Sequence, residues 1–589
     1  MRAARRGVAL ALLVTSCSLF GSTGQASAAQ PIVPRGVLIV LVPGVSFEQL
    51  LRHPTVRALA ARGGAALMPA RDDPRQTILD AFPHGGLHPL PTSGVDLRLT
   101  IVEQGFGPAP APLDALDAQI GKLVARFDVG ELLVAVVGDR PSAPMRATKD
   151  GLLPLVLATG QPGSLLDASS EPRSLTSEST RRAGVVVPAD LPTTIVDFVG
   201  HPIPGNPAGR AHAGSVIRTL DEPAPFELHA RYLTMRRMTV PVQTAAGVYV
   251  TLAGLFGIGL LALRRRAHHL PHLLVSIGAW LAMSVPALAV GLLAAGHLPT
   301  LSYATVVPFV VAVTVVGTLA FVPLARRDPL LAPAAIGWAV LAYFVVEAAA
   351  GWTAALTPFL GGSELDGGRF FGLPNVFIGL LVGASLFAAA SLPTAAGTTL
   401  LVLVAFFAGL PFAGANLGGS ITLFAAAGLW WAIRSRGRFD LRGLLVAAGV
   451  VVVGTALVLL SHRYLTSAPT HVTRFEETSA RSPSGIWRTF ADRMLVGWRL
   501  ILRNPFALVP VLGLGTALLA VLRPPGSVRT SLERRPAWRD ALLVTLLAGI
   551  VAIPVNDSWP AALGLAFGLG LGGLVYVSLI DGTWKMGTT

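Results

Sequence analysis

The chain is poor in cysteine and in charged residues, and acidic residues are the scarcer charge. Its 589 residues include one cysteine, Cys17, and only 13% are charged, with 32 acidic against 46 basic residues. One cysteine cannot form an internal disulfide, and cysteine chemistry and thiolate metal sites are excluded from any domain that follows it. Hydrophobic residues make up 52% of the chain, which is too many for an ordinary soluble protein.

Apolar stretches follow one another through the last 350 or so residues. A helix needs about 20 apolar residues to cross the hydrocarbon of a bilayer. About eleven stretches of that kind begin near Ala245, Leu273, Ala304, Leu331, Val376, Ala396, Ile421, Leu441, Phe506, Ala541 and Ala561. The sequence therefore predicts a polytopic, all-helical transmembrane domain over residues 243–583.

Arginine-rich segments follow the first, third, seventh and ninth stretches, at 264–266, 326–327, 434–442 and 523–539. All four fall on one side if the spans alternate, and basic loops favour the cytoplasmic side. This places residues 30–238 outside the cell and the C-terminus inside, in a bacterial plasma membrane. It also explains most of the net charge of +14, so we expect no nucleic-acid partner.

The loop over residues 462–504 is an exception, since it is basic yet expected to be external. From Ile486 onward, aromatic and aliphatic residues recur at helical spacing with arginines between them. This pattern is typical of a helix lying in the membrane interface against anionic head groups. Two interpretations stay open, an amphipathic connector without a ligand and a clamp for lipid phosphates.

The N-terminus has the features of a secretory signal. Residues 1–6 are basic, residues 8–14 are apolar, and Ala26, Ser27 and Ala28 form a small-residue cleavage site. Residues 14–17 also resemble a bacterial lipobox ending in Cys17. We favour cleavage after Ala28, because an additional lipid anchor adds little to a chain with many spans.

Residues 30–238 are the only segment suited to folding in water. Apolar runs at 37–42, 97–102, 132–137 and 153–158 are typical of buried strands. Helical patterns at 47–60, 113–127 and 191–199 alternate with them. This order predicts a doubly wound α/β domain with a mostly parallel sheet, where sites lie beyond the C-terminal ends of the strands.

The order of motifs in this domain resembles the alkaline-phosphatase superfamily. The resemblance rests on residues 37–51, 116–121, 132–139, 153–155 and 190–194, followed by Gly200 and Gly209. It implies two divalent metals held by Asp and His around a Ser or Thr nucleophile. However, Pro43 stands where the first Asp is expected, and the Asp-His pair reads Asp139-Arg140. We therefore expect a degenerate domain, a pseudoenzyme without a cofactor.

Remnants of a site are still represented in the sequence. Thr77 is a weak candidate nucleophile, and Arg140 could replace a metal by pairing with an anionic group, next to Asp139. Loop histidines form a further set that would need an acidic partner to bind metal: His84, His88, His201 and His212. A metal is expected only if the domain is an active enzyme.

Three motifs in the membrane half resemble those of bacterial membrane proteins that join a phosphatase-like outer domain to a helical bundle, a family without an assigned activity. They are residues 367–375, 414–419 and 556–559, the last with Trp559 in place of the family's glycine. By the topology above, all three lie at the external face, beneath the outer domain. Their glycines would let backbones approach closely.

Polar residues in and near these motifs are candidates for binding, because polar groups in hydrocarbon are costly unless paired. They are Arg369, Asn375, Asn416, Asn556, Asp557 and, within the fourth span, Glu347. The alternative for Glu347 is a purely structural ion pair with Arg369.

The sequence favours a membrane protein that acts in cell-envelope assembly or transport, with membrane lipids and an anionic or lipid-linked intermediate as partners. Two alternatives stay open: a metal-dependent phosphatase or phosphotransferase on a lipid-linked substrate, and a transporter with an accessory outer domain. The substrate, the direction of transport, the oligomeric state and any protein partners are not determined by the sequence.

Overall fold

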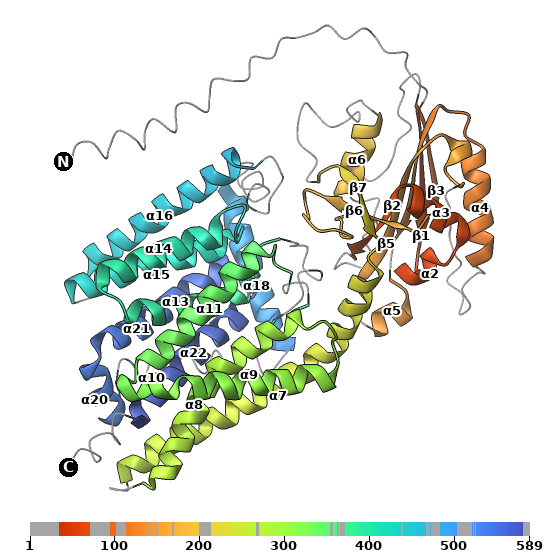
Figure 1. Ribbon diagram of the computed structural model, residues 1–589. Helices are drawn as coiled ribbons and strands as arrows, with labels where there is room; N and C mark the ends of the chain where they lie inside the picture. Colours follow the sequence, from red (N-terminus) through yellow and green to blue (C-terminus); the bar gives the residue numbers. More distant parts are fainter. Residues whose placement is uncertain are drawn as a thin grey trace, which may run out of the picture.

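The computed structural model has two parts, an N-terminal α/β domain and a C-terminal helical bundle (Figure 1). The residues it describes are 35–70, 95–101, 113–139, 141–148, 150–167, 170–199, 214–266, 270–353, 357–361, 365, 371–437, 440–466, 472, 483–503, 521, 523–524 and 526–580. The signal-like segment 1–28 and its two processing sites lie outside these residues.

The α/β domain contains one seven-stranded mixed sheet, in the order β3-β1-β4-β5-β2-β6-β7. The strands are β1 (Arg35–Val42), β2 (Gly64–Pro69), β3 (Val95–Ile101), β4 (Glu131–Gly138), β5 (Leu152–Gly160), β6 (Arg173–Ser177) and β7 (Ile217–Pro223). Both neighbours of β1 run parallel to it, whereas β5 is antiparallel to β4 and β2, and β7 is antiparallel to β6. The expectation of a mostly parallel sheet is therefore only partly correct.

Helices cover both faces of this sheet, as the alternating pattern predicts. On one face lie α2 (Phe47–Leu51), α3 (Pro54–Arg62) and α4 (Leu113–Ala125), and on the other α5 (Ala143–Ala147) and α6 (Asp190–Val199). The single helix expected over 47–60 is instead two. Ser46 starts α2 with a capping box, and Pro54, which lacks a backbone N–H, begins α3 after a break.

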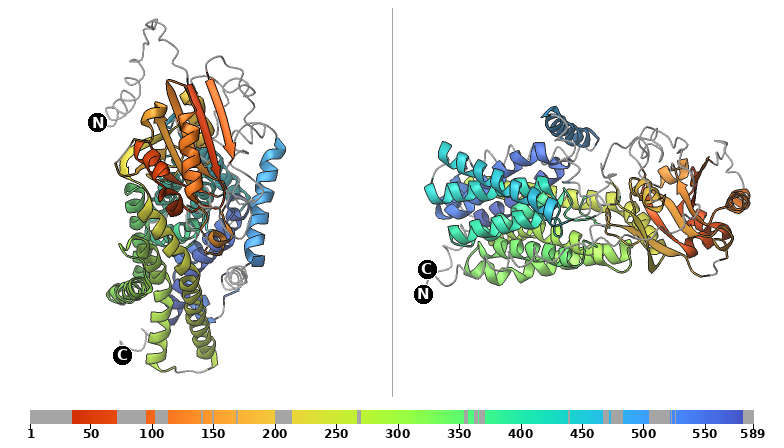
Figure 2. Two further views of the ribbon diagram at one scale, coloured as in Figure 1. Left: turned by 90° about the vertical axis from the view of Figure 1, so that its right-hand side faces the viewer. Right: turned by 90° about the horizontal axis from the view of Figure 1, so that it is seen from above.

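A single long helix connects the two parts. Helix α7 (Phe226–Arg266) has 41 residues, which is about 60 Å at 1.5 Å per residue. Its first turns pack under the sheet through Tyr232 and Met235, and its remainder lies along the bundle (Figures 1 and 2). A buried pair holds this junction: Nε2 of His229 lies 3.2 Å from both carboxylate oxygens of Asp150. The boundary expected near residue 238 thus falls inside a continuous helix.

The bundle consists mainly of apolar helices. Beyond α7 they are α8 (His272–Ala294), α9 (Tyr303–Ala320), α10 (Val322–Arg327), α11 (Leu331–Ala349), α13 (Phe377–Ala390), α14 (Thr394–Gly409), α15 (Leu417–Arg436), α16 (Leu441–Tyr464), α18 (Pro483–Arg503), α20 (Gly526–Arg534), α21 (Pro536–Val555) and α22 (Trp559–Ile580). Within the described residues, seven helices are long and apolar enough to cross a membrane, and α13 and α14 are shorter apolar helices. The expected number of about eleven spans is not confirmed, and the stretch near Phe506 lies outside the described residues.

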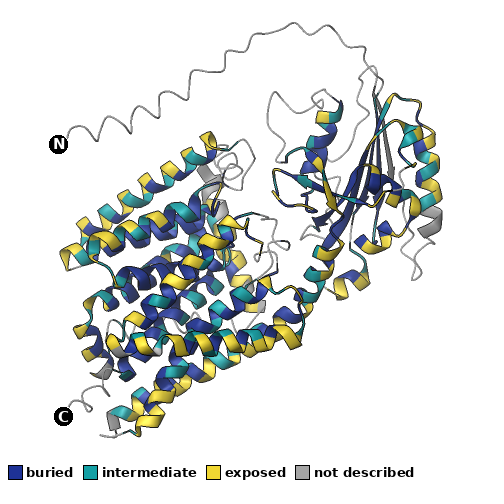
Figure 3. Cartoon of the chain, in the orientation of Figure 1, coloured by how far each residue is buried: buried dark blue, intermediate teal, exposed yellow. Residues whose placement is uncertain are grey.

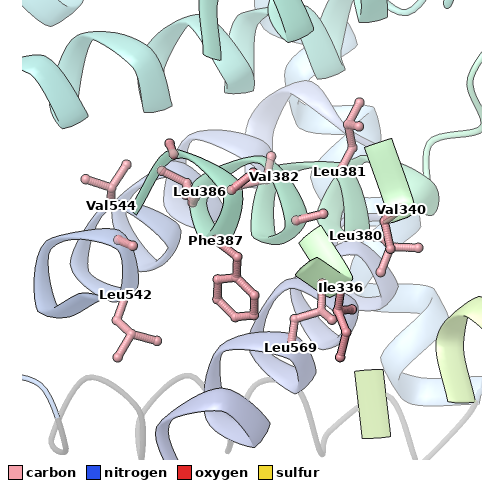
Figure 4. Close-up of a cluster of buried hydrophobic side chains, with 14 of the residues drawn as sticks. Ile336, Val340, Leu380, Leu381, Val382, Leu386, Phe387, Leu542, Val544 and Leu569 are labelled. Atoms are coloured by element: carbon pink, nitrogen blue, oxygen red, sulfur yellow. The ribbon is translucent and has the colours of Figure 1, made fainter. Parts of the chain in front are cut away.

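Helix α13 forms the centre of the bundle. Residues on all of its sides are buried, and its Phe387 packs against Trp538 of α21 with ring centroids 4.5 Å apart. Figure 4 shows this core, in which α13 meets side chains of α11, α21 and α22. By contrast, α7, α9 and α16 expose apolar side chains such as Leu252, Val316 and Val452 on the outside of the bundle (Figure 3). Apolar exposure of this extent fits a surface surrounded by hydrocarbon.

The bundle has two distinct ends. We call the end at which α7 leaves the α/β domain the domain-proximal end, and the other the domain-distal end. Arginine-rich segments meet at the domain-distal end: Arg264 donates to carbonyls at the end of α22, Arg434 lies 3.3 Å from Asp540, and Arg535 lies 3.9 Å from Asp328. The four segments used to predict the orientation therefore do share one end of the bundle.

Candidate functional site

Three segments that are distant in sequence meet at the domain-proximal end. They precede α13, α15 and α22 and contribute Asn375, Asn416, Asn556 and Asp557, which we call the polar cluster. Nδ2 of Asn375 donates to Oδ1 of Asp557 at 2.6 Å, and Nδ2 of Asn416 donates to Oδ1 of Asn375 at 2.9 Å. Asn556 joins them by donating to the Asn375 carbonyl at 2.9 Å. The structure thus brings these four residues together.

Glycines allow the three segments to come this close. Gly372 has a φ of +99°, and a Cβ there would lie 2.2 Å from the carbonyl oxygen of Gly414 in the second segment. A Cβ on Gly418 would lie 2.3 Å from the carbonyl oxygen of Val555 in the third segment. Because neither position has room for a side chain, the glycines of these motifs are required for the backbone contacts that form the cluster.

Three helix N-termini point into the polar cluster. Asn416 is the N-cap of α15 and accepts a hydrogen bond from Gly419 N at 2.9 Å, Asn375 lies just before α13, and Asp557 lies just before α22. The N-terminus of a helix carries a partial positive charge and favours anions. Three such ends at one place create a positive field, and the carboxylate of Asp557 is held there by Asn375 and by Ser558 Oγ at 3.0 Å.

An arginine of α18 adds a full positive charge beside the cluster. Nη1 of Arg493 donates to the carbonyl of Val555, the last residue of α21, at 2.6 Å. Burial lowers the pKa of Arg493, while the negative charge of Asp557 raises it. Arginine is protonated in proteins at any physiological pH, so this guanidinium places a positive charge next to the N-terminus of α22.

Helix α18 lies across the bundle helices instead of along them (Figures 1 and 2). It packs against α21 and α22 through Ile501, and Trp498 contacts Trp559 with ring centroids 5.9 Å apart. Along the same helix, Trp487 and Leu502 are exposed by 74% and 82%. The amphipathic helix predicted for loop 462–504 is therefore present, and its exposed apolar side chains suit the membrane interface.

Glu347 pairs with His297 among the residues that the structure describes. Its carboxylate, 3% exposed at the end of α11, lies 2.7 Å from Nε2 of His297. The hydroxyl of Tyr343 lies 3.4 Å from the same nitrogen and donates to the carbonyl of Leu293 at 3.2 Å. The pair expected between Glu347 and Arg369 is not tested, because Arg369 lies outside the described residues. Among the described residues, His297 is the ion-pair partner of Glu347.

In the α/β domain, Asp139 follows β4 beside the end of β1, and its backbone N donates to the Val42 carbonyl at 3.4 Å. It thus stands at the carboxyl ends of parallel strands, as the sequence predicts. Thr77, Arg140 and the four loop histidines lie outside the described residues. Within the described ranges, no group of three or more His, Cys, Asp or Glu side chains is arranged to hold a metal ion.

A turn of the α/β domain contacts two of the three segments that carry the cluster. Arg181, at a positive φ of 53°, donates to the Pro411 carbonyl at 2.9 Å and places its guanidinium 4.6 Å from the centroid of the Phe371 ring. Its neighbour Arg182 donates to the carbonyls of Gly351 and Trp352. The α/β domain is therefore connected directly to the backbone that forms the cluster.

The sequence did not identify Arg493, His297, Arg181 or Arg182 as part of these arrangements. Arg493 was one of several arginines assigned to lipid head groups. One signal was available for His297: the topology placed it in a short external loop, at the same membrane side as the end of the span that contains Glu347. For Arg181 and Arg182 no local pattern distinguishes them from other exposed arginines.

Comparisons of this chain with protein-family models, with curated proteins and with solved structures find no match.

Proposed function

We propose that this chain is a multi-pass bacterial plasma-membrane protein in which the polar cluster binds the anionic head group of a lipid-linked envelope intermediate, during cell-envelope assembly or transport. The α/β domain, with its degenerate phosphatase-like motifs, acts in this proposal as a non-catalytic external part. The observation that carries the proposal is the meeting of three helix N-termini with Arg493 at one point.

The depth of the cluster suits a head group. Helix α22 is one of the seven helices apolar enough to cross a membrane. It has 22 residues and begins two residues after Asp557, so it extends about 33 Å away from the cluster, which is about the thickness of the hydrocarbon. The cluster therefore lies at one edge of the apolar layer. A lipid-linked phosphate has its charge at that level and its chain in the hydrocarbon.

Different groups around the cluster would bind different parts of the ligand. Arg493 and the helix N-termini favour a phosphate, because guanidinium and backbone N–H groups bind its oxygens. Asp557, which accepts bonds from Asn375 and Ser558 through Oδ1, can accept a hydroxyl or amide proton of a sugar through Oδ2. Helix α18 places Arg493 at the cluster and faces the interface from which a lipid would enter.

Binding of polyprenyl phosphate to the full-length protein in nanodiscs tests the proposal, with the uncharged polyprenol as the comparison ligand. We expect Arg493→Gln to weaken phosphate binding about tenfold or more, since hydrogen bonds to charged groups are worth about 1.5–3 kcal/mol. Arg499→Gln is the matched control, because Arg499 is an exposed arginine of the same helix. Equal binding of both ligands, or equal effects of both variants, would refute the proposal.

A further inference from the structure

A large cavity opens among the helices at the domain-distal end, opposite the polar cluster. Its volume is about 800 Å³, within the range of roughly 300–1,000 Å³ that is usual for small-molecule sites. It lies between α8, α9, α11 and α22, and its lining includes Ser276, Trp280, Phe321, Ala332 and Tyr576. The lining is mostly apolar, as expected for a cavity that holds hydrocarbon.

Positive and polar groups stand where α22 ends beside this cavity. Nη1 of Arg264, near the end of α7, donates to the carbonyls of Ser578 and Leu579 at 3.1 Å each. The next residue, Ile580, lines the cavity, and so does His272 in the first turn of α8. Nη2 and Nε of Arg264 make no hydrogen bond with a described residue, so donors are available on a guanidinium that the end of α22 fixes in place.

We propose that this cavity binds an anionic phospholipid, with an acyl chain in the cavity and the phosphate at Arg264 and His272. Charge complementarity selects the occupant, because an apolar cavity beside a helix end that holds a guanidinium matches a lipid that joins an acyl chain to a negative head group. The helices that line it are among those apolar enough to span a membrane, so membrane lipid can reach it. The site is separate from the polar cluster and does not depend on its proposed function.

Native mass spectrometry of the full-length protein, released from nanodiscs of equal parts phosphatidylglycerol and phosphatidylcholine, tests this site. We expect phosphatidylglycerol to be retained preferentially by the wild-type chain. Ser276→Trp, which fills the cavity from an exposed position, should reduce retention at least tenfold. Leu273→Trp is the control on the same helix, because Leu273 is 71% exposed and does not line the cavity.

Arg264→Gln separates the contribution of the head group from that of the chain. We expect this variant to keep a bound lipid but to lose the preference for phosphatidylglycerol by several-fold. If Ser276→Trp fails to fold, Arg264→Gln still tests the proposal. Equal retention of both lipids by the wild-type chain, or the same preference in Arg264→Gln, would overturn the proposal.

Discussion

Replacing Asn416 tests whether the polar cluster holds the three segments together. The Asn416 side chain is 1% exposed and makes three hydrogen bonds: it caps α15 through Gly419 N, and it donates to Asn375 and to the Leu373 carbonyl at 2.8 Å. Loss of an N-cap costs about 1 kcal/mol. Each remaining bond contributes about 0.6–1 kcal/mol, the range for bonds between membrane helices and for hydrogen bonds in general. Asn416→Ala should therefore reduce the free energy of unfolding by about 2–3 kcal/mol.

Asn416→Ser separates the contribution of the N-cap from that of the hydrogen bonds to Asn375 and to the Leu373 carbonyl. Serine is a good N-cap but cannot reach Asn375 with an amide, so this variant should recover about 1 kcal/mol relative to Asn416→Ala. The measurement is reversible unfolding of the full-length protein in mixed micelles with increasing dodecyl sulfate, followed by circular dichroism. Thr422→Ala is the control, because the Thr422 hydroxyl donates only to Gly418 in its own helix.

Two results would refute this reasoning. A loss below about 0.5 kcal/mol in Asn416→Ala, the range of ordinary surface substitutions, would show that the bonds do not stabilise the bundle. Equal stability of the serine and alanine variants would show that the cap contributes nothing.

Three further predictions concern other residues. Asp557→Ala and Arg369→Ala should each abolish function in a complementation assay while the protein inserts normally, and normal growth with both would remove the binding role expected for these two residues. Glu347→Ala and His297→Ala should be coupled by on the order of 1 kcal/mol in a double-mutant cycle of unfolding, whereas additive losses would exclude a direct pair. Burial raises the pKa of Asp190, so the folded chain keeps this proton to higher pH than the unfolded chain does. The contribution of Asp190 to stability should therefore fall as pH rises above the ordinary carboxyl value of about 3.9. A melting-temperature series should show that the wild-type chain loses more stability over this range than Asp190→Asn does, whereas the same pH dependence in both would show that ionisation of Asp190 has no cost.

The sequence predicts those parts of the fold in which composition and periodicity agree. Strands β1, β4 and β5 are continuous apolar runs, buried on both faces, and were recognised as such. Strand β2 has the sequence GAALMP, with a glycine and a proline at its ends, and β6 and β7 carry many polar residues, so none of the three has a clear strand pattern. The directions of β5 and β7 depend on long connections, which a local pattern does not determine.

In the candidate site, too, some features could be predicted from the sequence and others could not. The convergence of Asn375, Asn416 and Asp557 could be predicted because alternating spans place their loops at one end of the bundle. The contact of Arg493 with Val555 could not, since it requires that α18 fold back across α21 and α22, and amphipathicity alone gives no direction. Placement by topology is thus predictable from the sequence, whereas the choice of partners between separate helices depends on tertiary packing.

Photo-crosslinking with a polyprenyl phosphate that carries a reactive group next to the phosphate tests the central claim most directly. The full-length protein would be labelled in nanodiscs, digested and mapped by mass spectrometry. We expect labels in residues 371–376, 410–416 and 555–559 and in α18 around Arg493, with labelling reduced by excess unlabelled polyprenyl phosphate and not by polyprenol. Labels confined to the α/β domain, or spread evenly over the exposed faces of α7, α9 and α16, would contradict the claim that the polar cluster binds an anionic head group.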